Sequence, residues 1–341
     1  MPQNQLKKKF RLGEVIAEKV VTIVAFFSLA MITLIFVFVF RETLPIFYGA
    51  DAEASSVPAQ IEQQETYGGE GVQEVAMQSK TSSHDTEGIA SIDNLTGTTW
   101  QPVSGKPKFG IVPLVLGSLK VSLIAILFAV PIAILAALFT SSFAPKWAKE
   151  LMKPAIEILA GIPSVVIGFF ALIVLASLIQ NIFGYQYRLN AFVGGVALSF
   201  AVIPIIYSIT EDAISRVPGS LTEASLALGA SKWETAIYVV LPAATPGIFA
   251  AVLLGIGRAF GETMIVLMAT GNAAMLSASL FEPVRTMSAT IGAEMAEVVF
   301  GETHYNVLFL IGSILFLFTF VLNAIAELFV RQRMMKKFQG I

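Results

Sequence analysis

Residues 220–242 read SLTEASLALGASKWETAIYVVLP and form a polar interruption between two long apolar stretches. Two serine–glutamate pairs in it have the spacing of a capping box, in which each partner satisfies a backbone N–H group at a helix start. The pairs are Ser220 with Glu223 and Ser231 with Glu234. A helix must end between two helix starts, and Gly229 suits that end because glycine adopts the left-handed conformation freely. The stretch therefore predicts an L of two short helices, the second ending at Pro242.

The composition around this interruption is typical of a membrane protein. The 341 residues are 55% hydrophobic and 13% charged, and the mean hydropathy is +0.76. A bilayer core needs about 20 apolar residues per helix. Six segments are long enough, and they run from about Val20 to Phe40, Ile111 to Phe139, Ala155 to Ile179, Ala191 to Ile209, Ala243 to Thr270 and Val307 to Val330.

The Lys and Arg residues predict the orientation, because cytoplasmic segments carry an excess of them. Of the 22 basic residues, fourteen lie in the two terminal segments, the second loop and the loop of residues 211–242, six lie in the opposite loops, and two, Lys120 and Arg258, lie within spans. Both termini and the 220–242 loop are therefore expected on the cytoplasmic side. The segment 41–109 carries ten acidic and four basic residues, and its residues 51–93 are expected to be disordered.

The 220–242 stretch resembles the EAA loop of ABC-importer permeases. The resemblance rests on Glu223-Ala224-Ser225, on Gly229, and on Val239-Val240-Leu241-Pro242, with Ser225 in place of the usual alanine and Val239 in place of the usual isoleucine. It implies a cytoplasmic coupling helix that inserts into a groove on a separate ATPase subunit. Without the resemblance, the loop would be an ordinary connection between helices of a membrane bundle.

A narrower resemblance covers most of the chain after residue 95. It rests on LTGTTWQPV, FGIVPLVLGSL, Gly161 to Gly168 (GIPSVVIG), Ile203-Pro204, Glu211-Asp212, Gly257 to Thr263 (GRAFGET), Pro283 to Thr286 and His304-Tyr305. Together these segments are similar to the PstC-type permease subunit of the phosphate-specific ABC importer, with the PstA-type sister subunit as the alternative. Sulfate, molybdate or another oxyanion stays open as the substrate, because arginine alone does not choose among tetrahedral anions.

The resemblance implies an all-α integral membrane protein with six transmembrane helices and the type I ABC importer permease fold. The expected divisions are 1–42 for the cytoplasmic N-terminus and first span, 43–110 for a hydrophilic, largely disordered periplasmic loop, 111–330 for the permease domain with the coupling loop at 211–242, and 331–341 for a cytoplasmic tail. The implied location is the cytoplasmic (inner) membrane. The implied partners are a PstA-type permease, two PstB-type ATPases, a PstS-type periplasmic phosphate-binding protein, phosphate and membrane lipid, with no nucleic acid.

Arg258 and Glu262 are the main candidates for the substrate path. Arg258 falls near the middle of the predicted fifth span, where an arginine costs a few kcal/mol, and its planar fork of donors suits two phosphate oxygens. Glu262 lies four residues later on the same helix face. Two roles are open for it: a structural ion pair with Arg258, or an acceptor for the proton that phosphate carries and sulfate lacks.

Three further features have two interpretations each. Ser164, in a segment weakened by Gly161, Pro163 and Gly168, is either a hydroxyl on the anion path or part of a close helix contact through small residues. The segment Glu282 to Glu302 is either a gate at the outer mouth or an interfacial packing helix. Arg285 within it either attracts anions or is a solvated surface arginine.

No catalytic or metal-binding pattern is present in the sequence. Gly105-Lys106 lacks the P-loop glycine five residues before Gly105, where Trp100 stands. The chain is therefore expected to be a non-catalytic transport subunit that binds no cofactor, with ATP and Mg²⁺ on the partner ATPase. Two alternative functions belong to other classes. A secondary anion transporter would need matched repeats of broken helices. A membrane signalling scaffold would not need an arginine at position 258.

Overall fold

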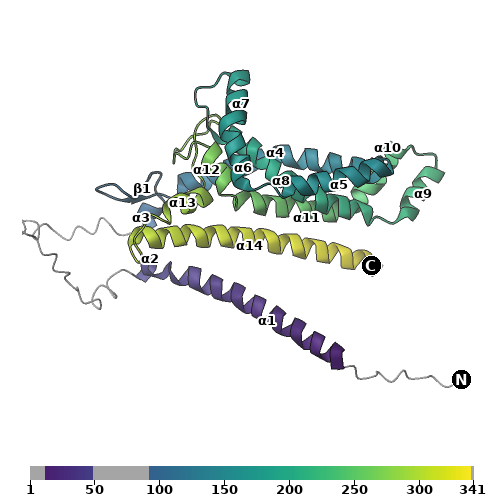
Figure 1. The fold of residues 1–341 in the computed structure, drawn as a ribbon, viewed down its shortest axis with the longest axis horizontal. Helices are drawn as coiled ribbons and strands as arrows, with labels where there is room; N and C mark the ends of the chain where they lie inside the picture. Colours follow the sequence, from purple (N-terminus) through teal and green to yellow (C-terminus); the bar gives the residue numbers. More distant parts are fainter. Residues whose placement is uncertain (1–11, 49–91, 339–341) are drawn as a thin grey trace, which may run out of the picture.

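The computed structural model describes residues 12–48 and 92–338, which are almost entirely helical (Figure 1). Six of the described helical segments are long and apolar enough to cross a membrane, which confirms the predicted fold class. They are Glu18–Phe47, Val112–Ser142, Ser164–Phe183, Ala191–Ser215, Lys232–Phe260 and Thr303–Leu328. The elements are α1 (Leu12–Arg41), α2 (Leu44–Tyr48), α3 (Ile92–Leu95), β1 (Trp100–Gln101), β2 (Lys108–Phe109), α4 (Val112–Ser142), α5 (Lys146–Ala160), α6 (Ser164–Phe170), η3 (Ala171–Leu175), α7 (Ala176–Phe183), α8 (Ala191–Ser215), α9 (Gly219–Ala227), α10 (Lys232–Thr235), η4 (Ala236–Val240), α11 (Leu241–Phe260), α12 (Met264–Ala269), α13 (Met287–Glu294) and α14 (Thr303–Phe338).

The core of the bundle lies where α4 runs along α8. Every fourth residue of α4 from 125 to 137 is a fully buried alanine, a spacing that keeps all four on one helix face. On α8, Gly195 faces Ile124 so closely that a Cβ would lie 2.5 Å from that side chain. Small residues let helix backbones approach each other within a membrane. Helix α11 packs on the same helix α8, and α14 packs on α11.

Helix α1 lies at the margin of the bundle. It contacts α14 through two ring pairs near its C-terminal end, Phe36 with Phe316 and Phe38 with Phe309. Figure 1 shows α1 diverging from α14 away from these contacts. Its apolar side chains from Val20 to Phe40 are therefore exposed in the chain taken alone.

The predicted third span, Ala155 to Ile179, starts too early. Residues 155–160 belong to α5, a separate helix with one buried residue that packs beside α8. The break at Gly161-Ile162-Pro163 separates it from the span, which begins at Ser164. Proline disfavours the helical conformation for the residue before it, and the neighbouring Gly161 weakens the helix further.

The predicted fifth span, Ala243 to Thr270, is wrong at both ends. It begins at Lys232, because α10, η4 and α11 are continuous, and it ends at Phe260. Gly261 caps α11, its N–H donating to the carbonyl oxygens of Gly257 and Ala259. The chain then resumes as the short helix α12, which packs against α6 and α8 instead of extending α11.

The two ends of the bundle differ in content (Figure 1). One end, called here the hairpin end, holds α3, α13, the N-terminal end of α14 and the antiparallel hairpin β1–β2, in which Trp100 pairs with Phe109. The opposite end, called the loop end, holds α9 and α10. The described N-terminal end of α1 and the C-terminal end of α14 also point toward the loop end.

The hydrophilic segment is only partly described. Its residues 49–91, to which most of the prediction of disorder applies, lie outside the described residues. Residues 92–110 form α3 and the hairpin, and the side chains of Trp100 and Phe109 are buried against α4, α13 and α14. This part of the predicted loop is therefore a folded element of the hairpin end.

Candidate functional site

The L-shaped loop forms with Gly229 at its corner. Gly229 has φ of 89°, the left-handed conformation predicted for it. Its N–H donates to the carbonyl oxygen of Leu226 at 3.0 Å, and the N–H of Ala230 donates to that of Ser225 at 3.2 Å. This pair of bonds is the Schellman motif, which satisfies carbonyl groups that the end of α9 leaves free.

One of the two predicted capping boxes is present. The Ser231 hydroxyl accepts from the N–H of Glu234, and the Glu234 carboxylate accepts from the N–H of Ser231 at 2.8 Å. The predicted box of Ser220 with Glu223 is wrong. Helix α9 begins at Gly219 with Pro218 as its N-cap, so Ser220 is already inside the helix and its hydroxyl does not cap it.

The second arm of the L does not end at Pro242, as predicted. Residues 236–240 form a π-helical turn that leads directly into α11, with Leu241 and Pro242 as the first residues of α11. Proline lacks an N–H and crowds the carbonyl group four residues earlier. The wider π turn accommodates Pro242 without a break in the helix. The second arm of the L and the fifth span therefore form one continuous rod.

The outer surface of the L carries exposed apolar side chains. Glu223 and Ala224 are exposed, and so are Leu228, at 90%, and Trp233. Leu226 is also exposed, but it lines the cavity between α9 and the ends of α4 and α8. An apolar surface on a polar loop at the end of the molecule is typical of a protein–protein contact. The geometry therefore suits insertion into a groove of a partner.

Arg258 and Glu262 form an ion pair at the C-terminal end of α11. Arg258 Nη2 lies 3.5 Å from Glu262 Oε2. The Arg258 side chain is half exposed, whereas that of Glu262 is 4% exposed. Arg258 is in the last turn of α11, just before the break at Gly261, and not in the middle of a continuous helix as predicted. The pair thus sits where broken backbone can line a path through the protein.

Four hydroxyl-bearing residues surround Glu262: Ser118 and Ser122 of α4, and Thr286 and Ser288 at the start of α13. The Ser288 hydroxyl donates to the backbone carbonyl of Glu262 at 2.5 Å. Ser118 accepts from the N–H of Met287 at 2.9 Å. The space between these groups leaves no room for a water molecule. In this conformation the Glu262 side is closed, and Arg258 is the exposed member of the pair.

No described contact joins Ser164 to the Arg258–Glu262 pair. Ser164 is the half-buried first residue of α6, after Pro163 as the N-cap. One turn later, Gly168 packs on α12, where a Cβ would lie 3.1 Å from the carbonyl oxygen of Met264. This contact favours the packing interpretation for Gly168, and the role of Ser164 on the path stays a prediction.

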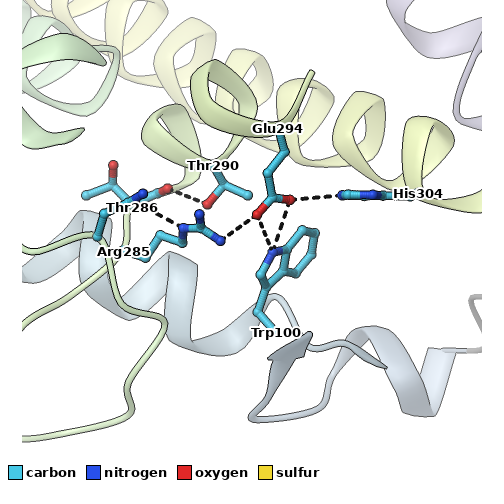
Figure 2. A network of polar contacts seen from close by, with 7 residues as sticks. Trp100, Arg285, Thr286, Thr290, Glu294 and His304 are labelled. Carbon is cyan, nitrogen blue, oxygen red and sulfur yellow. Dashed lines mark hydrogen bonds and ion pairs between the residues drawn. The ribbon is translucent and has the colours of Figure 1, made fainter. Parts of the chain in front are cut away.

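A second polar cluster at the hairpin end, which the sequence did not indicate, centres on Glu294 of α13 (Figure 2). Its carboxylate accepts from Trp100 Nε1 at 3.1 Å and lies 2.9 Å from His304 Nε2. It also forms an ion pair with Arg285. Arg285 donates from Nε to Asn272 at 3.0 Å, and its side chain is 17% exposed. Arg285 is therefore a paired, mostly buried residue, and the idea of a solvated surface arginine is wrong.

The Glu294 cluster holds a charged carboxylate at the edge of a cavity of about 750 Å³. Burial raises the pKa of Glu294, but the hydrogen bonds from His304 and Trp100 and the charge of Arg285 outweigh it, so the pKa is below its usual value. The same contacts fix the hairpin to α13 and α14. Helix α13 is buried at Met287 to Thr290, which favours the packing interpretation of Glu282 to Glu302 over a free gate.

Residues 129–334 match the family model described as "Binding-protein-dependent transport system inner membrane component". The chain is 38% identical over 234 residues to a probable ABC transporter permease, YqgH, of Bacillus subtilis, covering 69% of this chain and 76% of that one. It is 37% identical over 252 residues to the phosphate transport system permease protein PstC of Mesorhizobium japonicum, covering 68% and 76%. Among solved structures, a bacterial ABC transporter involved in alginate import aligns with 65% of this chain and 79% of that one, at 15% identity and a TM-score of 0.49.

Proposed function

Because the chain belongs to the family of binding-protein-dependent transport system inner membrane components, we propose that it is the PstC-type permease subunit of an ATP-driven phosphate importer. Family members are multi-span permeases of the inner membrane that work with an ATPase and a binding protein. The proposed substrate is phosphate. The proposed partners are of three types: a PstA-type second permease, two PstB-type ATPases and a PstS-type binding protein. The support for this assignment is the identity with phosphate permeases such as PstC of Mesorhizobium japonicum.

The observation that carries the proposal is the Arg258–Glu262 pair at the break after α11. Phosphate loses most of its water inside a membrane protein, so fixed charge and oriented donors must replace that water. The half-exposed guanidinium of Arg258 can donate to two phosphate oxygens at once. The neighbouring Glu262 carboxylate can accept a hydrogen bond from a protonated phosphate oxygen, which sulfate cannot offer near neutral pH.

The partner ATPase drives transport through its contact with the loop end of this chain. The L formed by α9 and α10, which holds Glu223, Ala224, Ser225 and Gly229, inserts into a groove of the ATPase, and Leu241 and Pro242 begin the α11 helix that follows it. The continuous rod from Lys232 to Phe260 supports this route, since its far end carries Arg258. ATP and Mg²⁺ bind to the partner ATPase, and this chain is a non-catalytic subunit that binds neither.

The loop end faces the cytoplasm in this proposal, together with both termini of the chain. Two observations support it. The basic residues are concentrated in the terminal segments and in the loops of that side. The described ends of α1 and α14 also point the same way as α9 (Figure 1). The hairpin end with its Glu294 cluster then faces the periplasm, where the binding protein delivers phosphate.

The test is uptake of labelled phosphate into proteoliposomes that hold the whole complex, with ATP on the side of the ATPases. We expect uptake to require ATP, to resist competition by sulfate, and to fall about a hundredfold in Arg258→Gln. Arg258→Lys keeps the charge but not the planar fork and should be intermediate. Unchanged uptake in Arg258→Gln would make Arg258 a structural residue, and an ATP-hydrolysing complex without phosphate uptake would point to another oxyanion.

A further inference from the structure

We propose that the hydrogen bond between Ser225 and Thr235 is the brace through which α9 moves the membrane span that carries Arg258. Ser225 is then a positioning residue for coupling ATP hydrolysis to transport. The inference rests on the permease function proposed above. The hydroxyl that it uses comes from Ser225, which stands where the EAA loop usually has an alanine.

The brace joins the two arms of the L. The hydroxyl oxygens of Ser225 in α9 and Thr235 in α10 are 2.9 Å apart. Thr235 is 2% exposed, so its end of the bond is fixed in the packed part of the structure. Among the side chains described, those of residues 18–47 and 93–328, it is the only side-chain hydrogen bond between α9 and another element. Helix α9 otherwise packs against α10 and η4.

A cavity separates α9 from the rest of the bundle. It has a volume of about 300 Å³ and is bordered by the C-terminal ends of α4 and α8 on one side and by Thr222 and Leu226 of α9 on the other. Thr235 also lines it, next to the brace. A force on α9 therefore has no packed route into α4 or α8 across this space. It reaches α8 through the three-residue connection 216–218, and it reaches α11 through the Gly229 corner, the contacts with α10 and η4, and the brace.

Thr235 links the brace to the helix that carries Arg258. It ends α10 and leads without a break into η4 and α11, up to Phe260. Arg258 is in the last turn of that rod. A glycine corner held by backbone bonds alone leaves the angle between the arms soft, whereas a side-chain bond across ten residues fixes it. Two arms that move together would pass a displacement of α9 to the far end of α11.

The experiment compares phosphate taken up per ATP hydrolysed in proteoliposomes that hold the complete complex. Ser225→Ala and Thr235→Val each remove one hydroxyl of the brace, whereas Ser225→Thr keeps a hydroxyl at position 225. Ser220→Ala is the matched control, because Ser220 is an exposed residue of the same helix. We expect ATP hydrolysis near the wild-type rate but about three- to tenfold less phosphate per ATP in the first two variants. Ser225→Thr and Ser220→Ala should keep the wild-type ratio, and the double variant should be no worse than either single one.

A wild-type ratio in Ser225→Ala would overturn the proposal. An equal loss of hydrolysis and uptake would also overturn it, because the bond would then serve docking and not coupling. Amide hydrogen exchange at residues 226–230 tests the brace without a substrate. If the wild-type complex hydrolyses ATP but takes up no phosphate, the proposed function fails on its own, while faster exchange in Ser225→Ala would still support the brace and unchanged exchange would refute it.

Discussion

Glu262 and Arg258 are paired but unequally buried: the carboxylate is almost fully enclosed, and the guanidinium 3.5 Å away is half exposed. Ser118, Ser122, Thr286 and Ser288 line the space beside Glu262, and this space has no room for water. The cation can therefore reach an anion on the open side while the carboxylate stays in place. Both roles of Glu262, a structural ion pair with Arg258 and an acceptor for the proton of phosphate, stay predictions.

Replacing Glu262 with glutamine should change selectivity. The amide can donate to an unprotonated oxygen, so sulfate should begin to compete while phosphate uptake falls about tenfold. Competition by sulfate in the uptake assay measures this, with Glu302→Gln, an exposed residue of the hairpin end, as the control. Normal phosphate uptake without any gain in sulfate competition would leave Glu262 as a structural partner of Arg258.

Replacing Glu294 with glutamine should loosen the hairpin end. The change leaves the mostly buried Arg285 without its ion pair, and weakens the bonds to Trp100 and His304. We expect a loss of about 2 kcal/mol in stability, seen as a lower midpoint of thermal unfolding in detergent. Glu297→Gln, an exposed carboxylate at the same cavity, should be neutral. Equal midpoints for both variants would contradict the role of the cluster.

The contribution of Glu294 should depend on pH in a defined direction. Its pKa is lowered from the ordinary 4.5 in the folded protein. A carboxyl group with a lowered folded pKa stabilises the protein above the unfolded pKa, and that stability is lost as the pH falls through the folded pKa. The difference in unfolding midpoint between wild type and Glu294→Gln should therefore be full at pH 7 and shrink below about pH 4.5. A difference that does not shrink at all below pH 4.5 would argue against this cause.

Replacing Gly117 with alanine should displace α13 from α4. A Cβ at Gly117 would overlap the backbone carbonyl of Arg285, which cannot rotate away. We expect a loss of about 2 kcal/mol from this overpacking. Gly105→Ala is the matched control, because a Cβ there meets no atom within 4 Å. The thermal midpoints of the two variants measure the difference, and an unchanged midpoint in Gly117→Ala would show that α13 can shift at little cost.

The features that could be predicted from the sequence are set by residues that lie close together in the chain. The six spans follow from runs of apolar residues, and the corner at Gly229 and the capping box of Ser231 follow from short spacings. Where an apolar run was longer than its helix, the prediction failed, as at Gly261, because packing of α12 against α6 decides that the chain turns there. The capping box predicted at Ser220 fails for a local reason, because Pro218 is the N-cap of α9 and the helix begins before Ser220.

The tertiary structure alone decided how distant residues meet. Trp100 and Glu294 are 194 residues apart in the chain and share a hydrogen bond. The hydroxyl groups around Glu262 come from α4 and from α13, and no spacing within one segment relates them. The sequence by itself determined the membrane class and the corner of the loop, because hydropathy and capping act over a few residues. The burial of Glu262, the pairing of Arg285 and the brace at Ser225 depend on how the helices pack, which no single stretch of sequence contains.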